Sequence, residues 1–232
     1  MTNIIIKIVV YLRKQELFQR IFHTMEYCIR HELEGCSTVL DIGCGPDSPI
    51  QHCAKDKYTV GVEPYKPYLK ISQKKKIHNK YLNKKIEDLD FPKNSFDAII
   101  LIDVIEHMDK KAGLTLMKKL DKWATKKIIM TTPNGYFSMG EIDGNSYQAH
   151  RSGWTVSDFA RVGYTCKGLT GAKFMYLSEN QVDSFSEGSF SFVNMRYKPK
   201  AFSFVINAIL QIFMYYLPEH AFELLAVRVK SE

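Results

Sequence analysis

Residues 37–47, Ser-Thr-Val-Leu-Asp-Ile-Gly-Cys-Gly-Pro-Asp, end an apolar run in a Gly-x-Gly turn and place an acid, Asp41, two positions before it. Glycines let a backbone approach a ligand closely, and the free N–H groups of a following helix favour an anionic group. The pattern therefore predicts a strand-turn-helix loop that binds a nucleoside cofactor. Ser48 and Pro49 are predicted to be the N-cap and first residue of the helix.

The number of glycines narrows the class of cofactor. A dinucleotide fingerprint has a third glycine that admits a pyrophosphate, but position 48 is serine, which disfavours a nicotinamide dehydrogenase. An acid ahead of Gly-x-Gly suits a cofactor with an amino-acid end, because the acid neutralises its ammonium group. The turn resembles motif I of the class I S-adenosylmethionine-dependent methyltransferases, although this chain has Asp47 where the family usually has a third small residue.

The next predicted strand ends in a second acid. The β-branched run Tyr58-Thr-Val-Gly-Val is followed by Glu63, and an acid about 20 residues after the glycine turn is the expected partner of a ribose diol in doubly wound folds. We therefore expect Glu63 to bind both ribose hydroxyls.

Residues 86–108, Ile-Glu-Asp-Leu-Asp-Phe-Pro-Lys-Asn-Ser-Phe-Asp-Ala-Ile-Ile-Leu-Ile-Asp-Val-Ile-Glu-His-Met, resemble the third and fourth motifs of the same family almost continuously. In relatives, an aspartate and the next backbone N–H hold the adenine. The place of that aspartate falls on Lys85, which leaves the Ile86 backbone and the carboxylate of Glu87 or Asp88 as substitutes. The resemblance implies a cofactor site made of Asp41, Gly43, Cys44, Gly45, Glu63, Pro64, Ile86, Glu87, Ile102 and Asp103.

Alternating apolar runs and helical patterns predict an α/β fold: a doubly wound, mostly parallel seven-stranded sheet. The expected strands are 37–42, 58–63, 80–86, 96–102, 126–132 and 163–169, and the expected helices are 16–32, 48–55, 66–75, 110–123 and 154–161. The resemblance adds an antiparallel seventh strand from Phe222 to Val229, beside 163–169. We expect one domain, 1–232, with a helical N-terminal segment 1–34 over the cofactor edge and lid or insertion segments 135–150 and 172–217.

Composition fits one cytoplasmic enzyme domain. A chain of 232 residues with 45% apolar content can bury a core without disulfides or metals. Five cysteines without a Cys-x-x-Cys pair disfavour a zinc ribbon or a disulfide framework. The apolar run Ile4 to Leu12 is interrupted by Lys7, and it predicts neither a signal peptide nor a membrane span.

The net charge of +7 could indicate a protein that binds nucleic acid, because many of the lysines lie within residues 66–85. Grooves for single strands combine positive charge with aromatic platforms, and here the aromatic side chains are sparse, at Tyr68 and Tyr81. We read the lysines as a solvated face and do not favour a nucleic-acid partner.

His107 and His150 are the candidate general bases, since each follows a predicted strand on the cofactor side and is neutral near pH 7. Asp103, Glu106 and His107, with His150 from the next loop, also form a candidate divalent-metal set. This set is similar to the Glu-x-x-Glu-His of ubiquinone-pathway O-methyltransferases and of small-RNA 2′-O-methyltransferases; the latter add a His-x-x-x-Trp that matches His150 and Trp154. We assign no metal and keep this set as an alternative.

The segments that would select the acceptor are less informative. Segment 172–200 contains aromatic residues of a candidate lid: Phe174, Tyr176, Phe185, Phe190 and Phe192. Residues 202–216 predict an apolar helix with a narrow polar stripe, Ser203, Asn207 and Gln211, which either packs on the sheet or in a homodimer, or lies at a membrane interface. From His150 onward the chain resembles methyltransferases found with polysaccharide-assembly enzymes.

These observations predict an S-adenosylmethionine-dependent methyltransferase that O-methylates a small molecule or a glycan. An RNA 2′-O-methyltransferase is the alternative enzyme, and a non-catalytic module that binds cofactor or nucleic acid is the alternative from another class.

Overall fold

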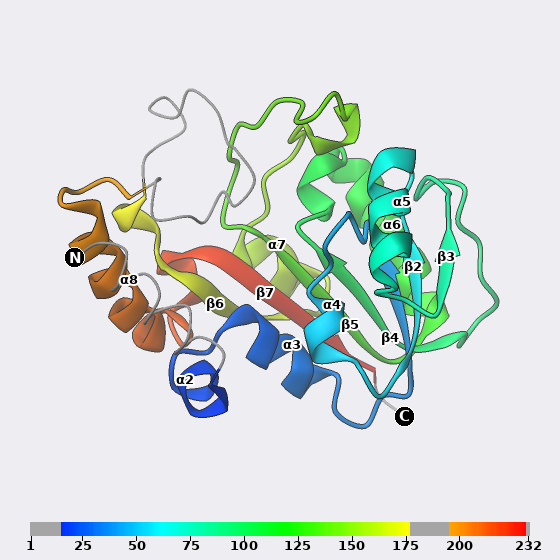
Figure 1. The fold of residues 1–232 in the computed structure, drawn as a ribbon, viewed down its shortest axis with the longest axis horizontal. Helices are drawn as coiled ribbons and strands as arrows, with labels where there is room; N and C mark the ends of the chain where they lie inside the picture. Colours follow the sequence, from blue (N-terminus) through cyan, green and yellow to red (C-terminus); the bar gives the residue numbers. More distant parts are fainter. Residues whose placement is uncertain (1–14, 177–194, 231–232) are drawn as a thin grey trace.

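The computed structural model describes residues 15–176 and 195–230. They contain a seven-stranded sheet in the order β3-β2-β1-β4-β5-β7-β6 (Figure 1). Its neighbouring strands pair in parallel except β7, which is antiparallel and lies between β5 and β6. The predicted doubly wound sheet with an antiparallel last strand is therefore confirmed. The strands are β1 (Thr38–Ile42), β2 (Tyr58–Val62), β3 (Lys80–Leu82), β4 (Phe96–Ile102), β5 (Ala124–Pro133), β6 (Thr165–Ala172) and β7 (Ala221–Val229).

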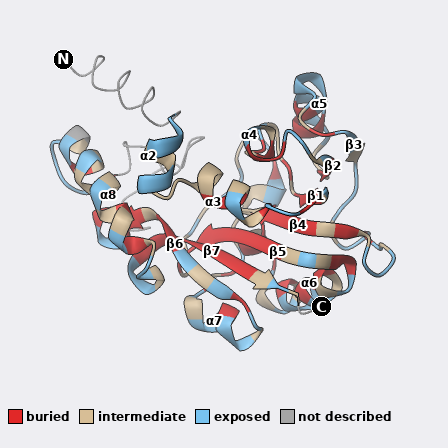
Figure 2. Cartoon of the chain, turned by 90° about the horizontal axis from the view of Figure 1, so that it is seen from below, coloured by how far each residue is buried: buried red, intermediate tan, exposed pale blue. Residues whose placement is uncertain are grey.

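Helices cover both faces of the sheet (Figures 1 and 2). On one face, α3 and α4 pack on the sheet through Ile29, Leu33 and Ile50. On the other, α6 and α7 bury Leu120, Trp123 and Phe159 against it. The described helices are α2 (Glu16–Ile21), α3 (Met25–Glu32), α4 (Ile50–Cys53), α5 (Lys66–Lys75), α6 (Lys110–Trp123), α7 (Val156–Arg161) and α8 (Lys200–Met214), with short 3₁₀ turns η1 (Ile105–His107), η2 (Ser146–Gln148), η3 (Lys173–Met175) and η6 (Pro218–His220).

This coverage explains the sequence of the central strands. Residues 98–101 of β4, Ala-Ile-Ile-Leu, are all fully buried, because a parallel strand in the middle of such a sheet has helices on both sides. Continuous apolar runs in β1, β4 and β5 therefore mark the interior of the sheet, and the polar residues that follow them mark its carboxyl edge.

The N-terminal segment differs from the prediction. We expected one helix over 16–32, but the chain forms two, because residues 22–24 leave the helical conformation and His23 has a φ of 46°. Thr24 then starts α3, accepting a hydrogen bond from the Tyr27 N–H. Residues 1–14 of the predicted segment 1–34 lie outside the described residues, so its packing over the cofactor edge stays a prediction.

Polar side chains attach α8 to the edge strand β6. The side-chain oxygen of Asn207 accepts from the Ala172 N–H at 2.8 Å, and its amide nitrogen donates to the Thr170 carbonyl at 3.1 Å. Gln211 accepts from the Gly171 N–H at 2.6 Å. These side chains take the place of a neighbouring strand, because they satisfy backbone groups that an edge strand leaves unpaired. The predicted helix is thus correct, and its polar stripe faces the protein.

The stripe is expected to contribute measurably to stability. Asn207→Ala should lower the free energy of unfolding by about 1–3 kcal/mol, since it leaves the buried Ala172 N–H of β6 without a partner. Urea denaturation followed by circular dichroism measures this change. Gln73→Ala, at an exposed position of α5, is the control and should change stability little. Equal stabilities of the two variants would contradict the role given to the stripe.

Candidate functional site

The glycine turn after β1 is fixed by the neighbouring strand. The N–H groups of Gly43 and Cys44 both donate to the Val62 carbonyl, at 2.8 and 3.0 Å. Gly43 has a φ of 72°, and a Cβ there would lie 2.5 Å from Cγ2 of Val104. Only glycine fits this position, because the Val104 side chain at the end of β4 occupies the space that a Cβ would need.

Glu63 joins this turn to the start of α5. Its Oε2 accepts from the Gly45 N–H at 3.0 Å, and its Oε1 accepts from the Tyr65 N–H at 2.8 Å. The residue is only 5% exposed, and burial raises the pKa of its carboxyl group, opposed by these two hydrogen bonds. A carboxylate has room for about four hydrogen bonds, so Glu63 retains acceptor capacity toward a ligand.

Asp41 is engaged inside the protein. Its Oδ2 accepts from the Ser48 hydroxyl at 2.6 Å and contacts Nε2 of His78 at 2.8 Å. Asp41 is 1% exposed and does not line the cavity described below, so its predicted contact with a cofactor ammonium stays a prediction. Ser48 is not the N-cap as predicted: Pro49 is, while the Ser48 hydroxyl also accepts from the Ile50 N–H.

A cavity of about 170 Å³ lies beyond the carboxyl ends of β1, β2 and β4. It adjoins a wider cavity of about 400 Å³ along α6, since both share Ile86, Glu87, Met108, Asp109 and Ala112. Such an edge is where open α/β sheets bind ligands. The smaller cavity is lined by Gly43, Glu63, Pro64, Lys85, Ile86, Glu87, Asp103, Val104, His107, Met108, Asp109, Ala112, Tyr147, Gln148 and Arg151.

Most of the predicted cofactor residues meet at this cavity. Gly43, Glu63, Pro64, Ile86, Glu87 and Asp103 line it, as does the predicted base His107. Asp41, Cys44, Gly45, Ile102 and His150 are outside its lining. The sequence analysis missed Tyr147, Gln148 and Arg151; Arg151 directly follows His150, and that position in the loop was the available signal.

Three acidic side chains come together beside the cavity. The backbone of Asp103 is left-handed, with a φ of 52°, and its Oδ1 accepts from the Thr131 hydroxyl at 2.9 Å. Burial, followed by the charge of Asp103, raises the pKa of Glu106 and that of Glu223 well above the ordinary value. Oε2 of Glu106 has no hydrogen-bond partner among the described residues. Glu223 was also missed, although it is the one acid in the last apolar strand.

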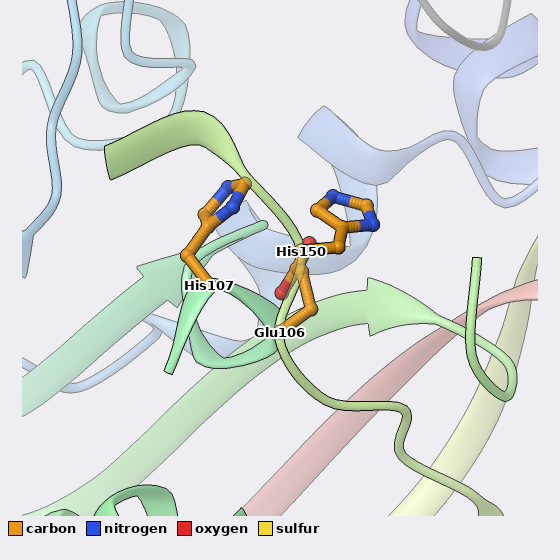
Figure 3. Close-up of side chains that lie close together, drawn as sticks. All are labelled: Glu106, His107 and His150. Atoms are coloured by element: carbon orange, nitrogen blue, oxygen red, sulfur yellow. The ribbon is translucent and has the colours of Figure 1, made fainter. Parts of the chain in front are cut away.

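The two candidate bases lie next to each other. The ring centroids of His107 and His150 are 4.9 Å apart (Figure 3). Nδ1 of His150 is 2.6 Å from the Phe137 carbonyl, and Nδ1 of His107 is 3.4 Å from the Ala149 carbonyl. Burial lowers the pKa of both rings, that of His107 to about 4 with the charge of His150 adding to the effect. Both are therefore neutral at pH 7, and a ring that donates from Nδ1 keeps a free lone pair on Nε2.

Backbone hydrogen bonds hold the His150 loop against η1. The N–H groups of Arg151 and Ser152 both donate to the Glu106 carbonyl, at 2.8 and 3.0 Å. Nε1 of Trp154 donates to the Ile105 carbonyl at 3.3 Å, and the indole is fully buried. These contacts explain how Glu106, His107 and His150 each offer a metal-ligand atom within 4.8 Å of the others (Figure 3).

The segment 135–150 also contacts the far side of the cofactor edge. The Tyr65 hydroxyl donates to the Asp143 backbone carbonyl at 3.0 Å, and the Tyr68 hydroxyl donates to the Asp143 carboxylate at 2.9 Å. This insertion therefore bridges from the histidine pair to α5, as a lid over the carboxyl edge would.

A family model described as "Methyltransferase domain" matches residues 40–123, the part of the chain that contains the glycine turn, Glu63 and η1. This part of the chain is therefore similar to methyltransferase domains. No curated protein sequence matches the chain.

Solved structures agree with this methyltransferase fold over nearly the whole chain. The plantazolicin methyltransferase BpumL, in complex with a triazolic desmethylPZN analog and SAH, is 14% identical with a TM-score of 0.54, and the alignment covers 97% of this chain and 90% of BpumL. A SAM-dependent methyltransferase from Archaeoglobus fulgidus is 17% identical with a TM-score of 0.50, covering 92% of this chain and 98% of that one. At these identities the likeness establishes the fold.

The lowered pKa of His107 predicts how stability depends on pH. The pKa of a histidine is ordinarily 6.5, and that of His107 in the folded protein is about 4. On acidification the unfolded chain therefore takes up a proton at His107 that the folded protein does not. The neutral His107 ring therefore contributes to the free energy of unfolding at neutral pH, and this contribution is lost as the pH falls from 6.5 to about 4. In His107→Gln this loss is absent, so the wild type should lose stability more steeply from pH 7 to pH 4.

Urea denaturation at a series of pH values measures both slopes. His31→Gln is the control, because His31 is a histidine at the surface. Parallel curves for wild type and His107→Gln would show that His107 titrates normally in the folded protein.

Proposed function

We propose that this methyltransferase transfers a methyl group to a hydroxyl group of a small molecule or a glycan. The observation that carries the proposal is the pair of neutral imidazoles, His107 and His150, at the cofactor edge of the sheet. A hydroxyl acceptor must lose its proton during transfer, whereas a neutral amine already has a free lone pair. A preserved base therefore favours oxygen as the acceptor.

The residues at the cavity suit S-adenosylmethionine, which when bound supplies an electrophilic methyl group on a sulfonium. Gly43 lines the cavity, and the free acceptor capacity of Glu63 suits the two ribose hydroxyls. Ile86 and Glu87 would hold the adenine at the junction of the two cavities. We assign the methionine end to Asp41, Gly43, Cys44 and Gly45, with Pro64, Ile102 and Asp103 completing the site.

The protein's part in the reaction is alignment and proton removal. The acceptor oxygen bonds to the methyl carbon, the carbon–sulfur bond breaks toward sulfur, and the hydroxyl proton passes to Nε2 of His107 or His150. Alignment of reacting groups can contribute about 7–11 kcal/mol, and a positioned base adds about 10²–10⁴-fold in rate. The Glu106 carbonyl positions the His150 loop, which keeps the two rings together.

The C-terminal part of the chain supports the class of acceptor. The likeness of the chain after His150 to polysaccharide-associated methyltransferases supports a sugar hydroxyl. Of the candidate lid, Phe185, Phe190 and Phe192 lie outside the described residues, while Tyr176 is buried and Phe174 is exposed. All five cysteines are free thiols, which supports our assignment of the protein to a reducing cytoplasm.

RNA is less well supported as an acceptor. In the lysine-rich segment 66–85, the Tyr68 hydroxyl bonds to Asp143 and the Tyr81 hydroxyl to the Ser72 carbonyl at 2.8 Å. Both aromatic rings are thus tied to the protein rather than presented as stacking platforms. This arrangement supports reading the lysines as a solvated face.

A divalent cation is the alternative to a free base. Glu106, His107 and His150 offer ligand atoms of a type that suits zinc or iron, and the buried Oε2 of Glu106 lacks a partner among the described residues. With a cation in place, the acceptor oxygen would be activated by the metal instead of by an imidazole.

We expect the purified enzyme to methylate members of a panel of sugars, glycans and phenols, and His107→Gln or His150→Gln to reduce kcat by about 10²–10⁴-fold. Affinity for S-adenosylhomocysteine should stay near the wild-type value in both variants, and His52→Gln, at an exposed position, should be fully active. Mass spectrometry of the products measures transfer, and calorimetry measures affinity.

Transfer to amines or to RNA alone would contradict the proposed acceptor. Activity should persist in a chelator. Inactivation by the chelator, reversed by a divalent ion, would show that a bound cation activates the acceptor instead of a free base.

A further inference from the structure

Helix α8 is amphipathic in the reverse sense to an ordinary surface helix. Its polar residues Ser203, Asn207 and Gln211 are 4–7% exposed, because Asn207 and Gln211 bond to β6 and the Ser203 hydroxyl donates to the Tyr197 carbonyl. The opposite face consequently presents apolar side chains to solvent, and Figure 2 shows exposed segments along the helix. The exposed residues are Phe202, Val205, Ile209, Phe213, Tyr216 and Leu217, between 40% and 63% exposed.

These six residues are called here the α8 stripe. From Phe202 to Tyr216 they recur every three or four positions, so they form one continuous row along α8 and the turn that follows it, and Leu217 extends the row. Scattered apolar residues on a surface need no explanation, but a contiguous apolar row marks an interaction site. The row is not needed to hold α8 in place, because the polar side chains and Phe204, Ile206 and Leu210 pack on the protein side.

Cations lie at both ends of the α8 stripe. Arg196 and Lys198 precede the helix and Lys200 is its first residue, while Nζ of Lys167 lies 5.5 Å from the ring centroid of Tyr216 at the other end. Residues 195–217 contain no aspartate or glutamate. An apolar, aromatic-containing helix face flanked by cations is the pattern of helices that lie in the interface of an anionic membrane.

The same charges disfavour a second copy of the chain as the occupant. Two α8 helices that pack across a two-fold axis perpendicular to them run antiparallel, which brings Arg196 and Lys198 of one copy toward Lys167 of the other. An axis along the helices makes them parallel and brings each of these cations toward its own copy in the partner. Like charges at both ends of a contact oppose association, whereas anionic lipid headgroups complement them.

We propose that the α8 stripe binds the surface of an anionic lipid bilayer, with α8 lying in the plane of the interface. Among the described residues no helix is both long and apolar enough to cross a membrane, so contact through this face is peripheral. The inference is independent of the proposed methyl transfer, because it concerns binding alone.

Flotation of the full chain with vesicles tests the proposal. The vesicles are phosphatidylcholine alone and phosphatidylcholine mixed with an equal amount of phosphatidylglycerol. The wild type should bind the anionic vesicles, less at high salt, and Ile209→Ser with Phe213→Ser should weaken binding by roughly tenfold or more. Ile71→Ser with Leu114→Ser, which removes exposed apolar side chains from α5 and α6, is the matched control and should bind like the wild type.

A charge variant, Lys167→Glu with Lys198→Glu, tests the same face without changing the stripe, and should also bind weakly. Absence of binding by the wild type, or equal binding by all variants, would overturn the proposal. Analytical ultracentrifugation distinguishes a bilayer from a second copy of the chain as the occupant of the α8 stripe. If the wild type is a dimer that does not float with vesicles, and Ile209→Ser with Phe213→Ser is a monomer, a second copy covers the stripe.

Discussion

The carboxylate of Glu63 is the contact on which the cofactor edge depends. By accepting from the Gly45 N–H and the Tyr65 N–H it connects the turn after β1 with the helix after β2. The loops that follow β1 and β2 are thereby held together. The Glu63 carboxylate lines the cavity and can still accept further hydrogen bonds. Burial makes this arrangement costly for an ionised group, as the raised pKa of Glu63 indicates. The glycine turn, the cavity and the proposed ribose contact all follow from it.

The other buried acids at this edge are compensated to different degrees. Asp41 has the Ser48 hydroxyl and the His78 ring, and Asp103 has the Thr131 hydroxyl. Glu106 and Glu223 differ, since Oε2 of Glu106 and Oε1 of Glu223 are buried without a partner in the described part of the chain. Uncompensated groups of this kind are commonly retained at functional sites, where stability is exchanged for chemistry. The position of Glu106 beside both histidines is therefore the physical reason to place proton transfer there.

The sequence predicted the sheet well because its signals are local. Apolar runs bounded by an acid or a glycine gave β1, β2 and β4 nearly to the residue, and the order of the motifs predicted which loops meet at the carboxyl edge. It did not predict the break at His23, whose positive φ has no signal in composition. It also could not show that Asp41 faces His78, a contact 37 residues apart that only tertiary structure creates. For α8, the polar stripe was visible, but its inward direction depends on the unpaired edge of β6.

Calorimetric titration with S-adenosylhomocysteine of the wild type, Glu63→Gln and the exposed control Glu34→Gln tests the central claim most directly. We predict binding to the wild type and the control, and a loss of about one to two orders of magnitude in affinity for Glu63→Gln, because an amide cannot accept from the turn, the helix and a diol as a carboxylate does. Thermal denaturation confirms that the variants are folded. Wild-type affinity in Glu63→Gln, or no binding to the wild type, would contradict the account of this edge as a nucleoside-cofactor site.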